Sequence, residues 1–393
     1  MAGAHLRGAG VKNEATLLLK LLNPGPVTLT PRVRAALGRP DLCHREPEFA
    51  ALQNEIRQRL VHVYADARSS HSAVLLTGSG TAAVEAMVGS LVPRGGRAIV
   101  VENGLYGERM MAMLGAQGKS AVPVRGPFSE PIDLASVERL LATERGITHV
   151  LAVHHETTTG RLNDIAALGK LCRAHGVPLL LDAVSSFGGE ALELDAWNLE
   201  AVAGVANKCL HGAPGIGFVL VRKEVLESRA SGATSVYLDL HRHHSEQERG
   251  STAFTQAVPA CQALDEALRE LEESGGWRAR HAHYRRLAER LFHGLRALGV
   301  RPLLSIEEPS SAVLTAYRLP SGCDYPSLHA ALKHAGFVIY SGQGALAAEI
   351  FRVAVMGDLV LADVERLLAA FADALRGGRA PLERAGRTSE AVA

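Results

Sequence analysis

The stretch VANKCLHGAPGIGFVLVRK, Val205–Lys223, decides the fold because it sets one lysine between an apolar run and a glycine- and proline-rich loop that opens a second apolar run. Taken alone, Lys208 could be a solvated residue at the rim of a sheet, as most lysines are. It could also be an amine that is held in a pocket and used as a nucleophile, since burial lowers the pKa of a lysine. The rest of the chain decides between these two interpretations.

From about Ser72 to Lys223, short apolar runs alternate with segments of helical period. The runs are AVLLT, RAIVVEN, THVLAVHHE, VPLLLDAV and GIGFVLVRK. Buried parallel strands joined by crossover helices give this pattern. We therefore predict an α/β domain with a mainly parallel sheet, in which ligands bind beyond the carboxyl ends of the strands.

Downstream, from about Leu264, the sequence becomes a long charged amphipathic stretch that is interrupted at Gly275-Gly276, which predicts two helices and a boundary. The segments that follow predict a smaller α+β domain: SSAVLTAYRL, LHAALKHAGF, FVIYSG, IFRVAVMG and LADVERLLAAFADALRGG. We assign residues 21–270 to a large domain and 271–376 to a small C-terminal domain. Residues 1–20 and 377–393 are expected to be flexible.

The composition predicts an ordinary cytoplasmic protein. Of the 393 residues, 47% are hydrophobic and 21% are charged, and 42 basic residues balance 41 acidic ones, so no overall field favours nucleic acid or an anionic membrane. The five cysteines are scattered without a CxxC pair and are expected to be reduced thiols. We find no apolar leader in residues 1–10 and no run of the roughly 20 apolar residues that a membrane helix needs.

The histidine-rich stretch HRHHSEQER, His241–Arg249, resembles a metal cluster at first sight. It lacks acids at ligand spacing after a strand, so we interpret it as an exposed charged loop and predict no metal site.

Three strand ends carry side chains that suit one cofactor. Gly78-Ser79-Gly80-Thr81 opens a helix and could seat a phosphate on its N-terminal N–H groups, although a plain capped turn would look the same. Asp182 directly follows a buried run, where a carboxylate needs a cation or hydrogen-bond donors. Lys208 follows a third run, and the residues between it and Asp182 are enough for one helix and one further strand. Pyridoxal phosphate needs all three, namely a phosphate anchor, a partner for its ring nitrogen and a lysine for its aldehyde.

Further side chains at strand ends suit the same site. Tyr106 in ENGLYGERM could stack on a planar ring, and the hydroxyls of ETTTG at 156–160 could bond the ring's phenolic oxygen, with loop packing and a hydroxyl-rich turn as the alternatives. Arg352 lies inside the apolar run FRVAVMG, where burying an unpaired guanidinium would be costly. Binding a carboxylate or phosphonate would give this guanidinium a partner. CHREPEF, Cys43–Phe49, is either a solvated mixed-charge turn or a second anion clamp through Arg45.

Taken together, these segments resemble a fold-type I pyridoxal-phosphate enzyme of the class V aminotransferase group, and within it the 2-aminoethylphosphonate:pyruvate transaminases. The resemblance spans roughly Leu21 to Arg376. It is carried by LLNPGPVTLTPRVRAAL, LLTGSGTAAVEAMVGSLV, NGLYGERM, HHETTTGRLNDI, LLLDAVSSFGGEALELD, ANKCLHGAPGIGFVLVRK and GFVIYSGQGALAAEIFRVAVMGDL.

The resemblance implies a role for each matching residue. Lys208 would hold the cofactor covalently, and Asp182 would face the pyridine nitrogen between ring neighbours Tyr106 and Val184. The cofactor's phosphate would be bound by Ser79, Gly80 and Thr81, with Thr255 reaching it across a homodimer interface. The cofactor's phenolic oxygen would be bound by Thr157, and the substrate anion by Arg352 with Pro24 and Gly25.

Two segments depart from that pattern. CHREPEF is similar to the histidine–arginine pair that grips phosphate in phosphoserine aminotransferases, and FRVAVMGD replaces the more usual FRIGNIG. The alternatives inside the group are a transaminase for amino acids with glyoxylate or pyruvate, or one that runs toward aminoethylphosphonate. Less favoured are a lyase or desulfurase, and a nucleotide-binding α/β protein that uses GSGT without catalysis.

Overall fold

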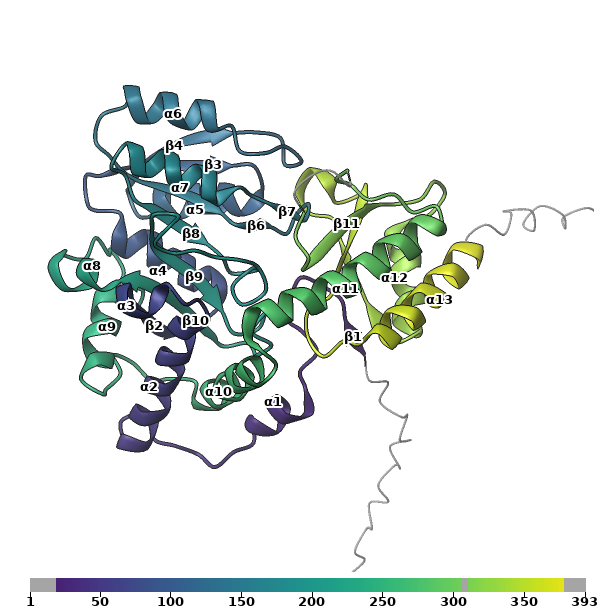
Figure 1. Cartoon of the computed structure of the whole chain (residues 1–393), viewed down its shortest axis with the longest axis horizontal. Helices are drawn as coiled ribbons and strands as arrows, with labels where there is room; N and C mark the ends of the chain where they lie inside the picture. Colours follow the sequence, from purple (N-terminus) through teal and green to yellow (C-terminus); the bar gives the residue numbers. More distant parts are fainter. Residues whose placement is uncertain (1–18, 306–309, 378–393) are drawn as a thin grey trace, which may run out of the picture.

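The computed structural model describes residues 19–305 and 310–377, in which a large α/β part and a smaller α+β part lie side by side (Figure 1). The segments predicted to be flexible, 1–20 and 377–393, lie almost wholly outside the described residues. Lys20 already belongs to a strand, β1 (Lys20–Leu21). No helix among the described residues is both long and apolar enough to cross a membrane.

A seven-stranded sheet forms the centre of the large part, as the apolar runs predict. Its strands, in spatial order, are β2 (His71–Thr77), β10 (Ile216–Arg222), β9 (Leu199–Val205), β8 (Leu179–Asp182), β5 (Ile147–Val153), β3 (Arg97–Glu102) and β4 (Ser120–Arg125). The pairs from β9 to β4 are parallel, which confirms the mainly parallel sheet. Strand β10 runs antiparallel to both of its neighbours, so the sheet is mixed at this edge.

Helices cover both faces of this sheet because neighbouring side chains on a buried strand point to opposite faces, as Leu75 and Leu76 do. One face packs against α2 (Pro47–His62), α3 (Ala67–Ser70), α6 (Leu134–Thr143), α7 (Ile165–Ala174) and α10 (Val258–Glu273). The other face packs against α4 (Gly80–Leu91), α5 (Leu105–Ala116), α8 (Lys223–Ser228) and α9 (Leu240–Glu248). The result is a three-layer architecture, which agrees with the predicted α/β domain.

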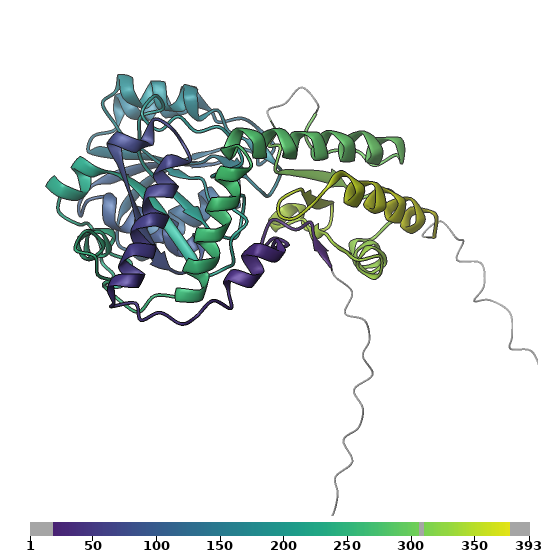
Figure 2. The same cartoon turned by 60° about the horizontal axis from the view of Figure 1, so that its bottom comes forward.

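The smaller part gathers around a second apolar cluster, which includes the inner faces of α11 and α13. Its elements are α11 (Gly276–Ala297), β11 (Leu314–Arg318), α12 (Tyr325–His334), β12 (Phe337–Val338), β13 (Tyr340–Ser341), η1 (Gly344–Leu346), β14 (Ile350–Ala354) and α13 (Leu361–Gly377). Strands β11, β14 and β13 form an antiparallel sheet, and β1 pairs with β12. Figure 2 shows α11, in green, extending from the large part across the small one.

The two predicted helices around Gly275-Gly276 are α10 and α11, and both glycines have positive φ, 97° and 74°. The predicted domain division at residue 270 stays a prediction. The chain turns between the helices a few residues beyond it, and α1 (Pro31–Ala36) packs against α10 on the way from β1 to the large part.

Two local predictions are wrong. Residues 183–198, between Asp182 and β9, form turns rather than a helix. His241–Arg249 is not an exposed loop, because α9 covers most of it and the ring of His243 is fully buried, where it contacts Phe254 and the carbonyl oxygen of Tyr237. Among the described residues no group of three or more His, Cys, Asp or Glu side chains could hold a metal ion.

Candidate active site

Lys208 lies just beyond β9, a strand whose seven residues are all buried. Its amine donates a short hydrogen bond to the carbonyl oxygen of Pro24, and burial lowers its pKa to about 8. A Cβ on Gly25 would lie 2.6 Å from Cδ of Lys208, and the φ of Gly25 is +119°, so only glycine leaves room for the lysine there. The predicted pair Pro24-Gly25 therefore lies against Lys208, whose amine is neutral in an appreciable fraction of molecules near neutral pH.

Asp182 ends β8, the parallel neighbour of β9, which places its carboxylate on the same sheet edge as Lys208. The side chain is 6% exposed, and Oδ1 accepts a hydrogen bond from the N–H of Val184 at 2.9 Å. Burial raises the pKa of Asp182 to about 6, while that hydrogen bond and the charges of Arg109 and Lys208 oppose the rise. The carboxylate can therefore hold a cation that is placed against its free oxygen.

The predicted phosphate seat is the start of α4. Ser79 caps this helix by accepting a hydrogen bond from the N–H of Ala82 at 3.2 Å, and Gly80 and Thr81 form its first turn. A Cβ on Gly80 would lie 2.6 Å from Cγ1 of Val184, so the missing side chain lets the helix approach the loop after Asp182. The helix start presents N–H groups and a positive dipole end, which suit a phosphate.

A narrow cleft joins Asp182 to the first turn of α4. It is lined by Gly80, Thr81, Val84, Tyr106, Arg109, Met110, Met113, Asp182 and Val184. The predicted ring neighbours Tyr106 and Val184 thus share a cleft with Asp182 and with the helix start.

Arg109 is a charged residue of this cleft that the sequence analysis missed. Its guanidinium lies 4.8 Å from the ring centroid of Tyr106, and Nη1 donates to Oγ1 of Thr81 at 3.4 Å. Three residues along a helix bring side chains to one face, so the spacing from Tyr106 was the available signal.

Arg352 brings the small part into the site. It lies in β14 between Phe351 and Val353, whose side chains point into the apolar cluster of the small part. Because neighbouring side chains on a strand point to opposite faces of the sheet, the side chain of Arg352 points away from this cluster. Arg352 is 0% exposed. Nε donates to the carbonyl oxygen of Ser341 at 2.8 Å, and Nη1 donates to the carbonyl oxygen of Thr157 at 3.0 Å and to Oε1 of Gln343 at 3.1 Å.

Several buried polar side-chain atoms lack a hydrogen-bond partner among the described residues, and four of them belong to residues linked to this site. They are Oδ1 of Asn23, next to Pro24, Nε2 of His155, Oγ1 of Thr157 and Nη2 of Arg352. Buried polar groups are normally paired, so these orphans indicate a polar ligand. Together with an amine, an acid and a helix start, they fit pyridoxal phosphate and an anionic substrate.

Arg45 and Thr255 are not brought to this site within one chain. Both residues are exposed, and neither lines the cleft. Arg45 precedes α2, and Thr255 precedes α10, on the surface of the large part.

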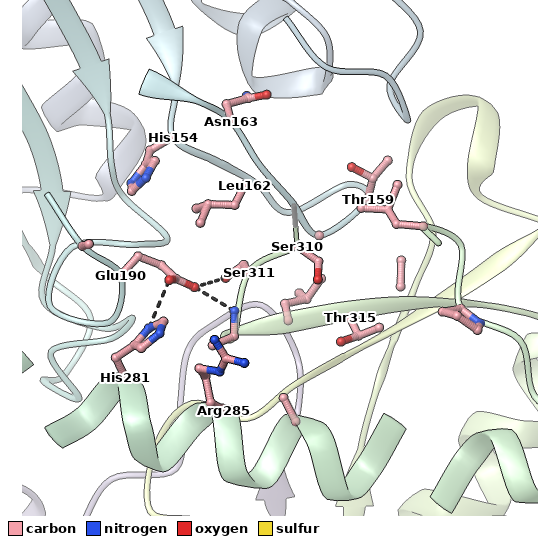
Figure 3. Close-up of a pocket in the computed structure, with 18 of the residues that line it drawn as sticks. His154, Thr159, Leu162, Asn163, Glu190, His281, Arg285, Ser310, Ser311 and Thr315 are labelled. Carbon is pink, nitrogen blue, oxygen red and sulfur yellow. Dashed lines mark hydrogen bonds and ion pairs between the residues drawn. The ribbon is translucent and has the colours of Figure 1, made fainter. Parts of the chain in front are cut away.

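A separate cavity of ≈ 720 Å³ lies behind the hairpin of β6 (His155–Glu156) and β7 (Arg161–Leu162), between the large part and α11 (Figure 3). Glu190, from the large part, bonds to residues that follow it in the smaller part. Its carboxylate accepts hydrogen bonds from the hydroxyl of Ser311 at 2.6 Å and the N–H of Ala312 at 2.8 Å, and it lies 3.1 Å from Nδ1 of His281. Neither Lys208 nor Asp182 lines this cavity, so it is not the cofactor site.

The comparisons with known proteins agree with this geometry. The model of the class-V aminotransferase family matches residues 32–357. A 2-aminoethylphosphonate–pyruvate transaminase of Vibrio vulnificus (strain YJ016) is 39% identical over 372 residues, covering 93% of this chain and 99% of that protein. The transaminase of the same name from Syntrophobacter fumaroxidans is 38% identical over 360 residues, covering 90% of this chain and 96% of that protein.

Solved structures give the same fold. An alanine–glyoxylate aminotransferase of Nostoc superimposes with a TM-score of 0.85 at 27% identity, covering 95% of this chain and 98% of that one. An aspartate aminotransferase of Thermus thermophilus gives a TM-score of 0.82 at 29% identity, covering 91% and 99%. The predicted fold-type I architecture is confirmed.

Proposed function

Because the chain belongs to the class-V aminotransferase family and is a pyridoxal-phosphate-dependent aminotransferase, we propose that it moves the amino group of 2-aminoethylphosphonate to pyruvate, giving phosphonoacetaldehyde and alanine. One observation carries the choice of an anionic donor. Nη2 of Arg352 is buried and unpaired among the described residues, whereas Nε and Nη1 are held by the protein. Since this amine has no carboxylate, its phosphonate must supply the charge that orients it, and a fixed guanidinium with a free nitrogen can bind it.

Each predicted cofactor residue has a place in this scheme. Lys208 would hold the cofactor and Asp182 would hold the proton on its pyridine nitrogen. The cofactor's phosphate would be bound by Ser79, Gly80, Thr81 and Arg109. Its ring would pack between Tyr106 and Val184, and its phenolic oxygen would bond to Thr157. When bound, the cofactor supplies an aldehyde that takes the amino group and a cationic ring that withdraws electrons from the carbon bearing it.

The chain's own residues then orient the donor and move one proton. Arg352 fixes the anionic end of the donor, so that the carbon bearing the amino group faces Nζ of Lys208. The depressed pKa of Lys208, about 8, would let Nζ take the proton from that carbon as a general base and then, as a general acid, give it up on the cofactor's side instead of returning it to the donor carbon. The carbonyl oxygen of Pro24 accepts a hydrogen bond from Nζ and restrains it between these transfers.

The proposal extends to a homodimer with shared active sites in the cytoplasm. Thr255 is exposed beside the partly exposed pair Tyr237 and Phe254, whose rings lie 5.1 Å apart, and Tyr237 donates to the carbonyl oxygen of Thr77 at 2.7 Å, next to the phosphate seat. A second copy of the chain that packs on this apolar surface, where Val236 is 66% exposed, could bring Thr255 to the phosphate. Arg45 could reach a substrate anion in the same way.

The test is a half-reaction screen. Purified holoenzyme is mixed with one amine at a time, without a keto acid, and the visible absorbance of the lysine-bound cofactor is followed. We expect 2-aminoethylphosphonate to bleach this band fastest and pyruvate to restore it. Indifference to this amine, with rapid bleaching by alanine or serine, would instead identify an amino-acid–glyoxylate enzyme.

A further inference from the structure

The proposed mechanism gives no task to Glu156, a carboxylate that is 0% exposed at the edge of the candidate site. It ends β6, and its own carbonyl oxygen accepts the N–H of Gly160 at 2.8 Å, which closes the turn of ETTTG. A buried carboxylate is costly to desolvate, and burial raises the pKa of Glu156 to about 7. A glutamine could accept the same N–H donors at a lower cost, so the presence of an ionisable carboxyl group at this position calls for a reason.

One oxygen of Glu156 is directed at the start of α5. Oε2 accepts the N–H of Tyr106 at 3.4 Å, where the positive end of the helix dipole favours a negative charge. A Cβ on Gly104 would collide with this oxygen, so the glycine before the helix makes room for the carboxylate. Since Tyr106 lies in the first turn of α5 and Arg109 directly after this turn, the carboxylate helps to set the position of both in the cofactor cleft.

The other oxygen of Glu156 fixes the turn that holds Arg352. Oε1 accepts the N–H of Thr158 at 3.0 Å and also the hydroxyl of that residue. Between these two residues, Thr157 offers its carbonyl oxygen to Nη1 of Arg352 and leaves Oγ1 buried without a partner among the described residues. Burial lowers the pKa of Arg352, and the charge of Glu156 is one of several nearby charges that oppose this shift.

We propose that Glu156 is a positioning residue whose carboxylate links the two halves of the active site. One oxygen places Tyr106 and Arg109 against the cofactor, and the other places Thr157 and, through it, the anion-binding guanidinium of Arg352. The part of this inference that concerns the donor's anion rests on the proposed function, whereas the part that concerns the cofactor does not.

Two substitutions separate the charge from the hydrogen bonds. Glu156→Gln keeps an acceptor for the N–H groups and removes the charge, whereas Glu156→Ala removes both. The matched control is Glu200→Gln, since Glu200 is 3% exposed and bonded to His149 and Arg229 outside the site. A merely structural role for Glu156 would make all three variants lose thermal stability without changing the balance between KM and kcat.

The first measurement is the dissociation constant of pyridoxal phosphate from the apoenzyme, by equilibrium dialysis. We expect Glu156→Ala to weaken this binding about tenfold or more, because two N–H groups lose their acceptor, and Glu156→Gln to stay within about threefold of the wild type. Unchanged cofactor binding in Glu156→Ala would overturn the cofactor part of the proposal, whatever the amino donor is.

The second measurement is KM for 2-aminoethylphosphonate in a double-mutant cycle with Arg352→Lys. We expect Glu156→Gln to raise KM about tenfold with little change in kcat, and to add less than about twofold once Arg352 has been replaced. Fully additive effects on KM, or an effect on kcat alone, would overturn the link to Arg352. If the enzyme does not accept this donor, the dialysis result still stands, and the cycle is run with the anionic amine that bleaches the cofactor band fastest.

Discussion

Replacing Arg352 by glutamine should remove the preference for an anionic donor while leaving the chemistry intact. The protein already occupies Nε and Nη1 through Ser341, Thr157 and Gln343, so Nη2 is the nitrogen left to the substrate. A hydrogen bond to a charged partner in a buried site contributes about 1.5–3 kcal/mol, which corresponds to a loss of about 10- to 150-fold in the rate of the donor half-reaction.

The assay compares a donor that carries an anionic group with one that lacks this group. Holoenzyme is mixed in single turnovers with 2-aminoethylphosphonate or with ethylamine, which lacks the phosphonate, and the loss of the cofactor band gives an apparent second-order rate. Arg352→Gln should slow the first donor by this factor and change the second by less than about threefold, because ethylamine has no anion to bind.

The matched control is Arg57→Gln. Arg57 is also a buried arginine, but its side chain bonds to the carbonyl oxygen of Ala73 and the hydroxyl of Ser72 in the large part. Equal losses with both donors in Arg352→Gln, or no loss with the phosphonate, would refute the assignment of Arg352 to the substrate's anion.

Three further outcomes follow from named contacts. Gly25→Ala should weaken cofactor binding and slow turnover at least tenfold, measured by dialysis and steady-state rates, because its Cβ would occupy the space of Lys208 and its φ of +119° strains an alanine; wild-type behaviour would contradict this. The rate of pyridoxal-phosphate uptake by the apoenzyme should rise with pH around a midpoint of about 8, since only the neutral amine of Lys208 reacts; a stopped-flow midpoint near 10.5 would argue against it. The stabilisation by Glu190 is measured as the difference in Tm between the wild type and Glu190→Gln. This difference should be largest between pH 4.5 and 6.5. Pairing with Glu190 raises the pKa of His281, so the stabilisation that His281 provides is complete below pH 6.5 and is lost as pH rises through the raised pKa. The pKa of Glu190 is lowered, so the stabilisation that Glu190 provides is present above pH 4.5 and is lost as pH falls through the lowered pKa. A flat difference across pH would show that the ion pair is not formed.

The sequence by itself determined the layered fold and several groups of the candidate site. Strands such as β5 and β8 each contain a short continuous apolar run, and such runs indicate strands from local pattern alone. Parallel strands also end at one sheet edge, so Asp182 and Lys208, each placed just after a run, had to lie near one another. The capped start of α4 was readable from GSGT for the same local reason.

Only the tertiary structure decided the rest, because it depends on contacts between segments that are distant in the chain. Nothing local to Ile216–Arg222 distinguishes an antiparallel strand from a parallel one, and nothing in residues 183–198 shows that packing replaces a helix by turns. Likewise, the free nitrogen of Arg352 exists because Thr157, from the large part, binds another nitrogen of the same guanidinium. Sequence patterns report how one segment is buried, whereas the direction and the partners of a side chain are fixed only when the segments pack together.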